Sequence, residues 1–171
     1  RGDDVVVSLD GKAIVNEEYA VGVKIDKEDK WYIHADFSQW TRYYDARGGS
    51  DALRPLTSAT GLNRELALDI GKFDVELGLF FEAFPDIKLR YEHGYKDGAK
   101  SRLAWFSTTE AGSARKIMPG YEEIDETEDS IELELTHNLL GFDVTATQYW
   151  EFVRDTSTLI TGNSAVREIK E

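Results

Sequence analysis

The chain has 171 residues, of which 41% are hydrophobic and 31% are charged, and 33 acidic against 20 basic side chains give a formal charge of −13. This size fits one domain over residues 1–171. The acidic balance argues against binding to nucleic acid or to an anionic lipid surface, and the lack of cysteine excludes thiolate metal sites and disulfides. No apolar run reaches the roughly 18 residues that would predict a transmembrane helix.

The N-terminal third predicts one weak strand and one hairpin. A strand is expected near residues 4–9, with Asp10-Gly11 as a turn signal. Apolar residues then occupy the odd positions of residues 19–25 and 31–37, and a charged turn joins the two runs, so strands are expected over residues 17–25 and 31–43. Alternation with period two places one set of side chains on each face of a strand, so each run predicts a strand with an apolar face and a polar face.

The middle of the chain predicts a second hairpin, with strands over residues 66–82 and 87–96. The apolar positions are even at Leu66 and Leu68 but odd from Phe73 onward, so the phase changes around Gly71. This predicts a β-bulge there, the alternative being that residues 66–70 belong to a folded loop.

The last third predicts a hairpin over residues 128–137 and 142–153, and a weak strand near residues 165–170. Turns within the hairpins are short, whereas the joins over residues 44–65 and 97–125 are long. Short turns alternating with long loops, and strands of about 9–11 residues, are typical of outer-membrane barrels. We therefore predict an all-β antiparallel meander of hairpins that forms a transmembrane β-barrel or part of one.

Aromatic residues gather near the ends of these strands, where Trp and Tyr would meet the boundary between lipid and water. The alternative is the ordinary preference of aromatic residues for strands. The predicted membrane-interface aromatics are Trp31, Trp40, Tyr43, Tyr44, Tyr95 and Trp150.

No motif in the sequence predicts catalysis, a cofactor or a metal site. His34, His93 and His137 are isolated and lack metal-ligand spacing. Nucleophile-elbow, P-loop and dinucleotide-binding motifs are missing from the sequence. We therefore expect a protein that is not an enzyme.

The charged residues predict the lining of a water-filled lumen. Acidic residues crowd residues 122–134, which is interpreted as a solvated loop, the alternatives being a cation-attracting mouth or a Ca²⁺ site. The basic residues expected to oppose this segment are Lys88, Arg90, Lys96, Lys100 and Arg102. The predicted pore-lining residues, acting through charge and size, are Asp74, Glu76, Lys88, Arg90, Glu92, Glu132 and Glu134.

The runs Asp74–Leu79, Phe84–Ser101, Tyr121–Glu126 and Ser130–Leu133 resemble bacterial outer-membrane porin-like barrels, including those that sheathe multihaem cytochromes. The resemblance implies an outer-membrane location, contact with the lipid bilayer and with other outer-membrane or periplasmic proteins, and a role in passing small solutes or scaffolding a partner in the lumen. The chain ends in Arg167–Glu171 rather than in an aromatic residue, so a segment of a larger barrel is expected. The alternative is a soluble exported β-sandwich that acts as a binding module.

Overall fold

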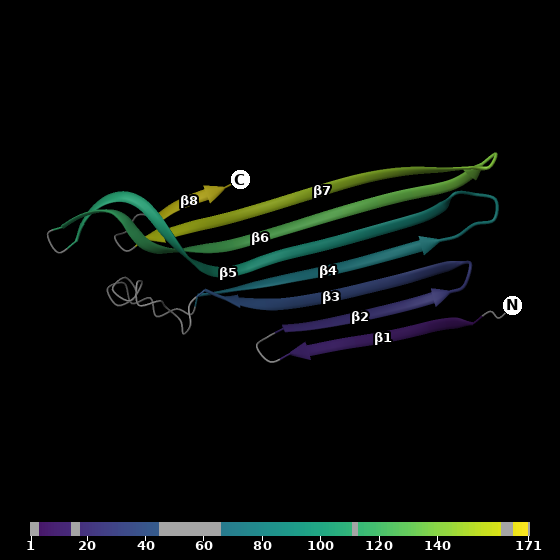
Figure 1. Cartoon of the computed structure of the whole chain (residues 1–171), viewed down its shortest axis with the longest axis horizontal. Helices are drawn as coiled ribbons and strands as arrows, with labels where there is room; N and C mark the ends of the chain where they lie inside the picture. The colour runs from purple at the N-terminus through teal and green to yellow at the C-terminus, as the bar shows by residue number, and fades with distance from the viewer. Residues whose placement is uncertain (1–3, 15–17, 45–65, 111–112, 162–165, 171) are drawn as a thin grey trace. The chain divides into compact units, whose positions relative to one another are not determined.

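The computed structural model of the protein describes residues 4–14, 18–44, 66–110, 113–161 and 166–170. These residues form one eight-stranded sheet whose strands follow one another in chain order (Figure 1). The strands are β1 (Val5–Ile14), β2 (Glu18–Lys27), β3 (Trp31–Tyr43), β4 (Ala67–Leu79), β5 (Asp86–Glu110), β6 (Ser113–Leu139), β7 (Phe142–Thr161) and β8 (Val166–Lys170). The all-β antiparallel meander predicted from the sequence is confirmed.

The described sheet is not closed into a barrel. Strands β1 and β8 stand at the two ends of the strand order, and each has one neighbour among the described strands. No helix in the described ranges is long and apolar enough to cross a lipid bilayer. The structure therefore shows the meander without a closing pair of strands.

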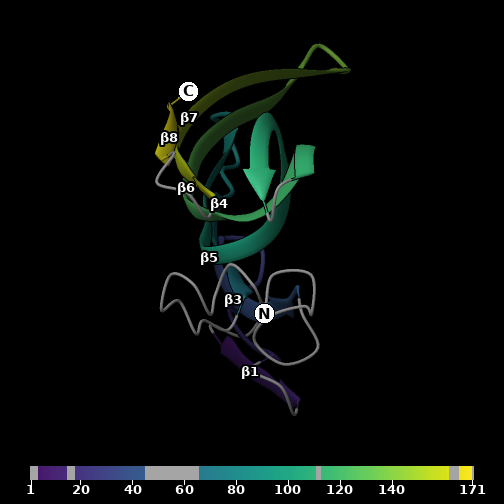
Figure 2. The ribbon, with the colours of Figure 1, turned by 90° about the vertical axis from the view of Figure 1, so that its left-hand side faces the viewer.

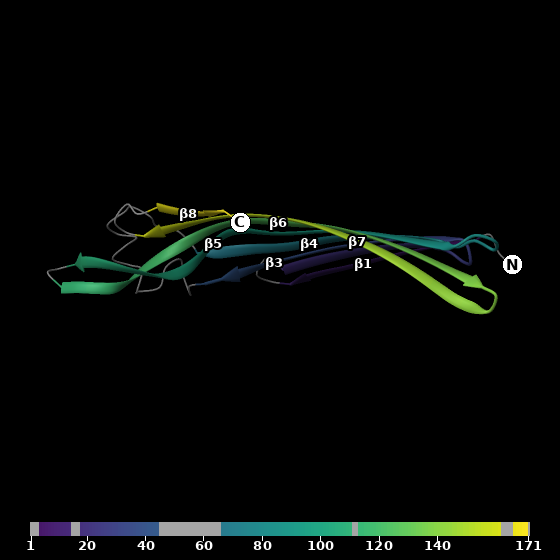
Figure 3. The same cartoon turned by 90° about the horizontal axis from the view of Figure 1, so that it is seen from above.

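The predicted long connection over residues 97–125 is wrong. Most of it continues strands β5 and β6, which are 25 and 27 residues long and run on as a hairpin (Figures 1 and 3). This extension of β5 and β6, the far hairpin, is drawn in teal and green and faces the viewer in Figure 2. The prediction failed because it relied on apolar alternation, whereas charged residues join the two strands here, as in the ion pair of Lys100 with Glu122. The other predicted join lies mostly outside the described residues.

The terminal strands are confirmed, but the first is longer than predicted. Strand β1 continues to Ile14, so the predicted turn at Asp10-Gly11 is wrong. Asp10 pairs with Gly22 and Gly11 pairs with Val21 in an unbroken ladder. A local turn signal was overridden because pairing with β2 holds these residues extended.

The pairing of β4 with β3 has no net insertion around Gly71, so the predicted bulge does not occur between these two strands. Tyr44 N donates to Leu66 O at 2.9 Å and Phe80 N donates to Lys30 O at 2.8 Å, and equal numbers of residues separate these two bonds on β3 and on β4. The even positions of β4 therefore stay on one side of the strand. The apolar residues change from even to odd positions because the even side of the strand faces a buried cluster at Leu66 and ion pairs at Asp74.

Two compact units divide the chain. Unit 1 comprises Arg1–Trp40, Gly71–Gly94 and Thr127–Val153, and unit 2 comprises Thr41–Ile70, Tyr95–Glu126 and Arg154–Glu171. In unit 2, a small buried cluster contains Leu66, Ala99 and Tyr121, with Tyr44 packed against it. In unit 1, the register aligns apolar residues on one face, as in the pairs of Val21 with Phe37 and Ile25 with Ile33.

The turn between β6 and β7 holds a strained leucine. Leu140 has φ 55° and Gly141 has φ 87°, as in a type I′ turn, and the Leu140 side chain is 99% exposed. A leucine in this left-handed region costs about 1 kcal/mol, which asparagine largely avoids. We expect Leu140→Asn to raise the free energy of unfolding by about 1 kcal/mol, measured by urea titration. Leu140→Ala, which keeps a Cβ, should leave the midpoint nearly unchanged, and an equal gain in both variants would contradict this explanation.

Candidate functional site

The polar face of unit 1 carries ion pairs between β4 and β5. Arg90 Nε donates to Asp74 Oδ2 at 2.6 Å, and Lys72 Nζ lies 2.8 Å from Glu92 Oε2. Arg90 Nη2 is also 3.4 Å from Glu92 Oε2. Alternate residues of paired strands share a face, so the structure brings together charged residues that are far apart in sequence.

Tyr32 of β3 extends this network across a third strand. Its hydroxyl donates to Glu76 Oε1 at 2.7 Å, and Lys88 Nζ lies 3.6 Å from Glu76 Oε2. The Tyr32 ring lies over Gly78, where a Cβ would come within 2.0 Å of ring atom Cε1. A glycine on the polar face is the sequence signal that could have indicated this close approach.

Glu132 and Glu134 of β6, the remaining predicted pore-lining residues, are half-buried. Because alternate residues of a strand share a face, these two carboxylates lie on the same face of β6.

A cavity of about 330 Å³ opens on the same face of unit 1. Its lining includes Asp10, Asp36 and Ser38, together with the ion-paired Arg90. Gly22 lies between the two aspartates in the ladder, and a Cβ there would come 2.7 Å from Asp36 Oδ1 and 2.9 Å from Asp10 Oδ1. The sequence analysis missed both aspartates, because only the register shows that they flank one glycine.

The acidic segment is part of strand β6, so its interpretation as a loop is wrong. In unit 2, the Glu122 side chain is only 5% exposed and forms ion pairs with Lys100, at 3.3 Å, and with Arg102. Glu126 pairs with Lys96. These basic residues oppose the segment as predicted, whereas Lys88 and Arg90 bind carboxylates of β4 instead. A buried carboxylate needs such partners, because an unpaired buried charge is costly.

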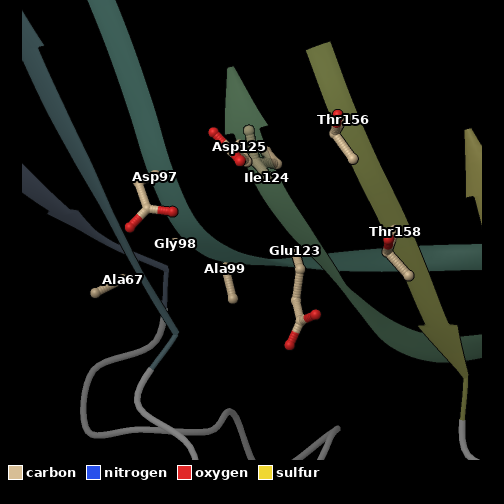
Figure 4. A pocket seen from close by; sticks show the side chains of 9 residues that line it. All are labelled: Ala67, Asp97, Gly98, Ala99, Glu123, Ile124, Asp125, Thr156 and Thr158. Atoms are coloured by element: carbon tan, nitrogen blue, oxygen red, sulfur yellow. The ribbon is translucent and has the colours of Figure 1, made fainter. Parts of the chain in front are cut away.

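A larger cavity, of about 440 Å³, lies within unit 2 and is lined by β4, β5, β6 and β7 (Figure 4). Asp97 and Glu123 stand on either side of Gly98 and Ala99 in Figure 4. The other polar lining groups are Asp125, Thr156 and Thr158. In the described part of the chain, no group of three or more acidic, histidine or cysteine side chains could hold a metal ion.

Two histidines pair with carboxylates. His34 Nε2 is 2.8 Å from Asp26 Oδ1, and His93 Nδ1 is 2.8 Å from Asp129 Oδ1. The Tyr91 hydroxyl also donates to Asp129, at 2.6 Å. These pairs were not predicted, because they depend on cross-strand register, and they satisfy the histidines structurally.

The predicted interface aromatics are at least partly exposed, but the prediction that they lie at strand ends is wrong for Tyr95 and Trp150, because β5 and β7 continue well beyond these residues. Trp31 begins β3 beside the short turn, and Trp40 and Tyr43 lie at its other end. Tyr95 lies where β5 enters unit 2, and Trp150 is close to the point where β7 does so. Tyr44 differs, because it packs against the buried cluster of unit 2.

Comparison of the chain with protein-family models, with curated proteins and with solved structures finds no match. The function must therefore be argued from the contrast between the two faces of the sheet. In unit 1, ion-paired side chains cover one face, while apolar side chains such as Phe73 and Leu89 are exposed on the other.

Proposed function

We propose that the chain is a sector of a bacterial outer-membrane β-barrel that gives passive passage to small solutes. The observation that carries this proposal is the contrast between the two faces of unit 1: large apolar side chains are exposed on one face, while the other face carries a network of ion-paired charged side chains. In the proposal, the apolar face contacts lipid and the charged face lines water.

Simple energetics favour lipid as the partner of the apolar face. A large apolar side chain left in water forgoes about 1.5–3 kcal/mol relative to burial, and many are exposed here. A soluble antiparallel sheet places such a face against protein. The charged face cannot be the one that contacts lipid, because a lysine or arginine in the middle of a bilayer costs about 2–4 kcal/mol.

In lipid, the two edges of the sheet must also pair with further strands. Strand edges expose unpaired backbone groups, and each such group costs several kcal/mol in hydrocarbon. Both β1 and β8 have one neighbour in the described sheet. A sector of a larger barrel, completed by additional strands, meets this requirement.

Passage through the lumen needs neither covalent chemistry nor a cofactor. Charges of both signs on the polar face would create a transverse field and hold water, which is what a porin interior uses to select solutes by size and charge. The pore-lining residues proposed for this role are those of the ion-pair network, together with Glu132 and Glu134.

The test replaces neighbouring residues on opposite faces of β1 with arginine. Leu9 is 74% exposed on the apolar face, and Ser8 is exposed on the polar face. In liposomes, we expect Leu9→Arg to lower the free energy of unfolding by about 2 kcal/mol, with Ser8→Arg close to the parent protein. Urea titration followed by tryptophan fluorescence measures both variants.

Two results would contradict the proposal. A parent chain that is monodisperse and β-rich in buffer without detergent would favour the soluble sandwich. Equal effects of Leu9→Arg and Ser8→Arg in liposomes would show that the apolar face does not contact lipid. Planar-bilayer conductance of the reconstituted chain then tests passage itself, and folded but non-conducting protein would overturn that part.

A further inference from the structure

The described apolar residues divide sharply between the two units. The buried hydrophobic residues all belong to unit 2, and they are Leu66, Leu68, Ala99, Tyr121 and Ile124. With the exception of Tyr43, the exposed large hydrophobic residues all belong to unit 1. Among the side chains that the structure describes, those of unit 2 include buried apolar residues, as in a protein core in water, while unit 1 exposes its large apolar residues.

Strand β4 shows the same change along a single run of residues. Leu66 and Leu68 are buried in unit 2, whereas Asp74 and Glu76, at even positions of the same strand, join the ion pairs of unit 1. One side of the strand is therefore apolar in unit 2 and charged in unit 1. This change is expected if the even side of the strand faces a protein core in unit 2 and the water-lined polar face in unit 1.

The lengths of the strands also indicate that only the unit 1 part of each long strand crosses the bilayer. Crossing a bilayer takes about 9–11 residues, far fewer than the 25 of β5 and the 27 of β6. At about 3.3 Å per residue, Trp31 and Trp40 of β3 lie about 30 Å apart, or about 23 Å along the membrane normal for a strand tilted by about 40°. The apolar band of an outer-membrane barrel is about 25 Å tall.

Aromatic residues mark the end of unit 1 on three strands. Trp40 is its last residue on β3, Tyr95 directly follows its last residue on β5, and Trp150 lies shortly before its last residue on β7. Amphipathic rings favour the boundary between lipid and water. The short turns after β2 and β6, with Asp29 and Leu140, belong to unit 1 and lie at its other end.

We infer that the membrane boundary coincides with the end of unit 1, and that unit 2 stands in water with its own small apolar core. This inference rests on the proposed function. It assigns the partner of each region: acyl chains contact the apolar face of unit 1, and solvent surrounds the far hairpin of β5 and β6. The Glu122 ion pairs and the acidic cavity lie on the aqueous side.

The test uses two single cysteines on β5, because the chain has no cysteine of its own. Leu89→Cys probes the exposed apolar face of unit 1, and Ser101→Cys probes an exposed position in unit 2. Each thiol is labelled with the environment-sensitive fluorophore NBD, and the protein is reconstituted into phosphatidylcholine liposomes. We expect blue-shifted, several-fold brighter emission at residue 89, and emission at residue 101 that matches the probe in water.

The possible results separate the inference from the proposed function. Water-like emission at both positions would overturn the proposed function and, with it, this inference. Lipid-like emission at both positions would overturn the inference alone. Lipid-like emission confined to residue 101 would overturn both, because the apolar face of unit 1 would then not contact lipid. A second pair, Val144→Cys in unit 1 and Asp125→Cys in unit 2, provides the same comparison if a variant of the first pair does not fold.

Discussion

Replacing Gly98 with alanine is expected to lower the free energy of unfolding by about 4 kcal/mol, the sum of a backbone term and a packing term. Gly98 has φ +134°, a backbone conformation that residues other than glycine rarely adopt. A Cβ at this position would lie 2.2 Å from the carbonyl oxygen of Ala67 on β4. Backbone cannot swing aside as a side chain can, so β4 and β5 would have to separate.

The matched control is Gly94→Ala, on the same strand. A Cβ at Gly94 would meet Glu128 at 3.9 Å, an ordinary contact, so this change should cost little. Urea titration followed by circular dichroism, in the medium in which the parent chain folds, measures both variants. If Gly98→Ala unfolds at the same urea concentration as Gly94→Ala, the close approach of β5 to Ala67 is not part of the folded structure.

Replacing Gly78 with alanine is expected to cost about 3 kcal/mol, because the new methyl group overpacks the site and removes a hydrogen bond. The Tyr32 ring occupies the space, with Cε1 2.0 Å and Cζ 2.5 Å from the position of a Cβ. The ring must turn away, which breaks the bond from its hydroxyl to Glu76 and its contact with Phe80.

A double-mutant cycle tests this explanation. In a Tyr32→Ala background the space is empty, so Gly78→Ala should have a much smaller effect than in the parent chain. Gly11→Ala is the control, since a Cβ there would meet only Ala20 O, at 3.9 Å. Additive effects of the two substitutions would show that Tyr32 does not lie on Gly78.

Apolar alternation predicted strands correctly where each face of the strand meets the same environment along its whole length. Residues 19–25 and 31–37 alternate in this way, and the structure places them in β2 and β3 with the expected shared face. The alternation failed for residues 97–125, because charged cross-strand pairs hold that hairpin and leave no period of apolar residues.

The predicted pore-lining residues could be assigned to one face, but their partners could not. Alternation places Asp74, Glu76, Lys88 and Arg90 on polar faces, since it needs only the period of the strand. Which lysine meets which carboxylate depends on the stagger of neighbouring strands, and the sequence does not encode that stagger in any local pattern. The contact of Tyr32 with Gly78 was missed for the same reason.

The sequence by itself determined the antiparallel meander, the short turns within its hairpins, and the apolar and polar faces of strands such as β2 and β3, because these follow from local periodicity and turn chemistry. Only the tertiary structure decided that Leu66 and Leu68 are buried while Phe73 is exposed. It also decided that Glu122 lies between Lys100 and Arg102. Burial and charge pairing depend on which strands meet and in what register, and these are properties of the whole sheet.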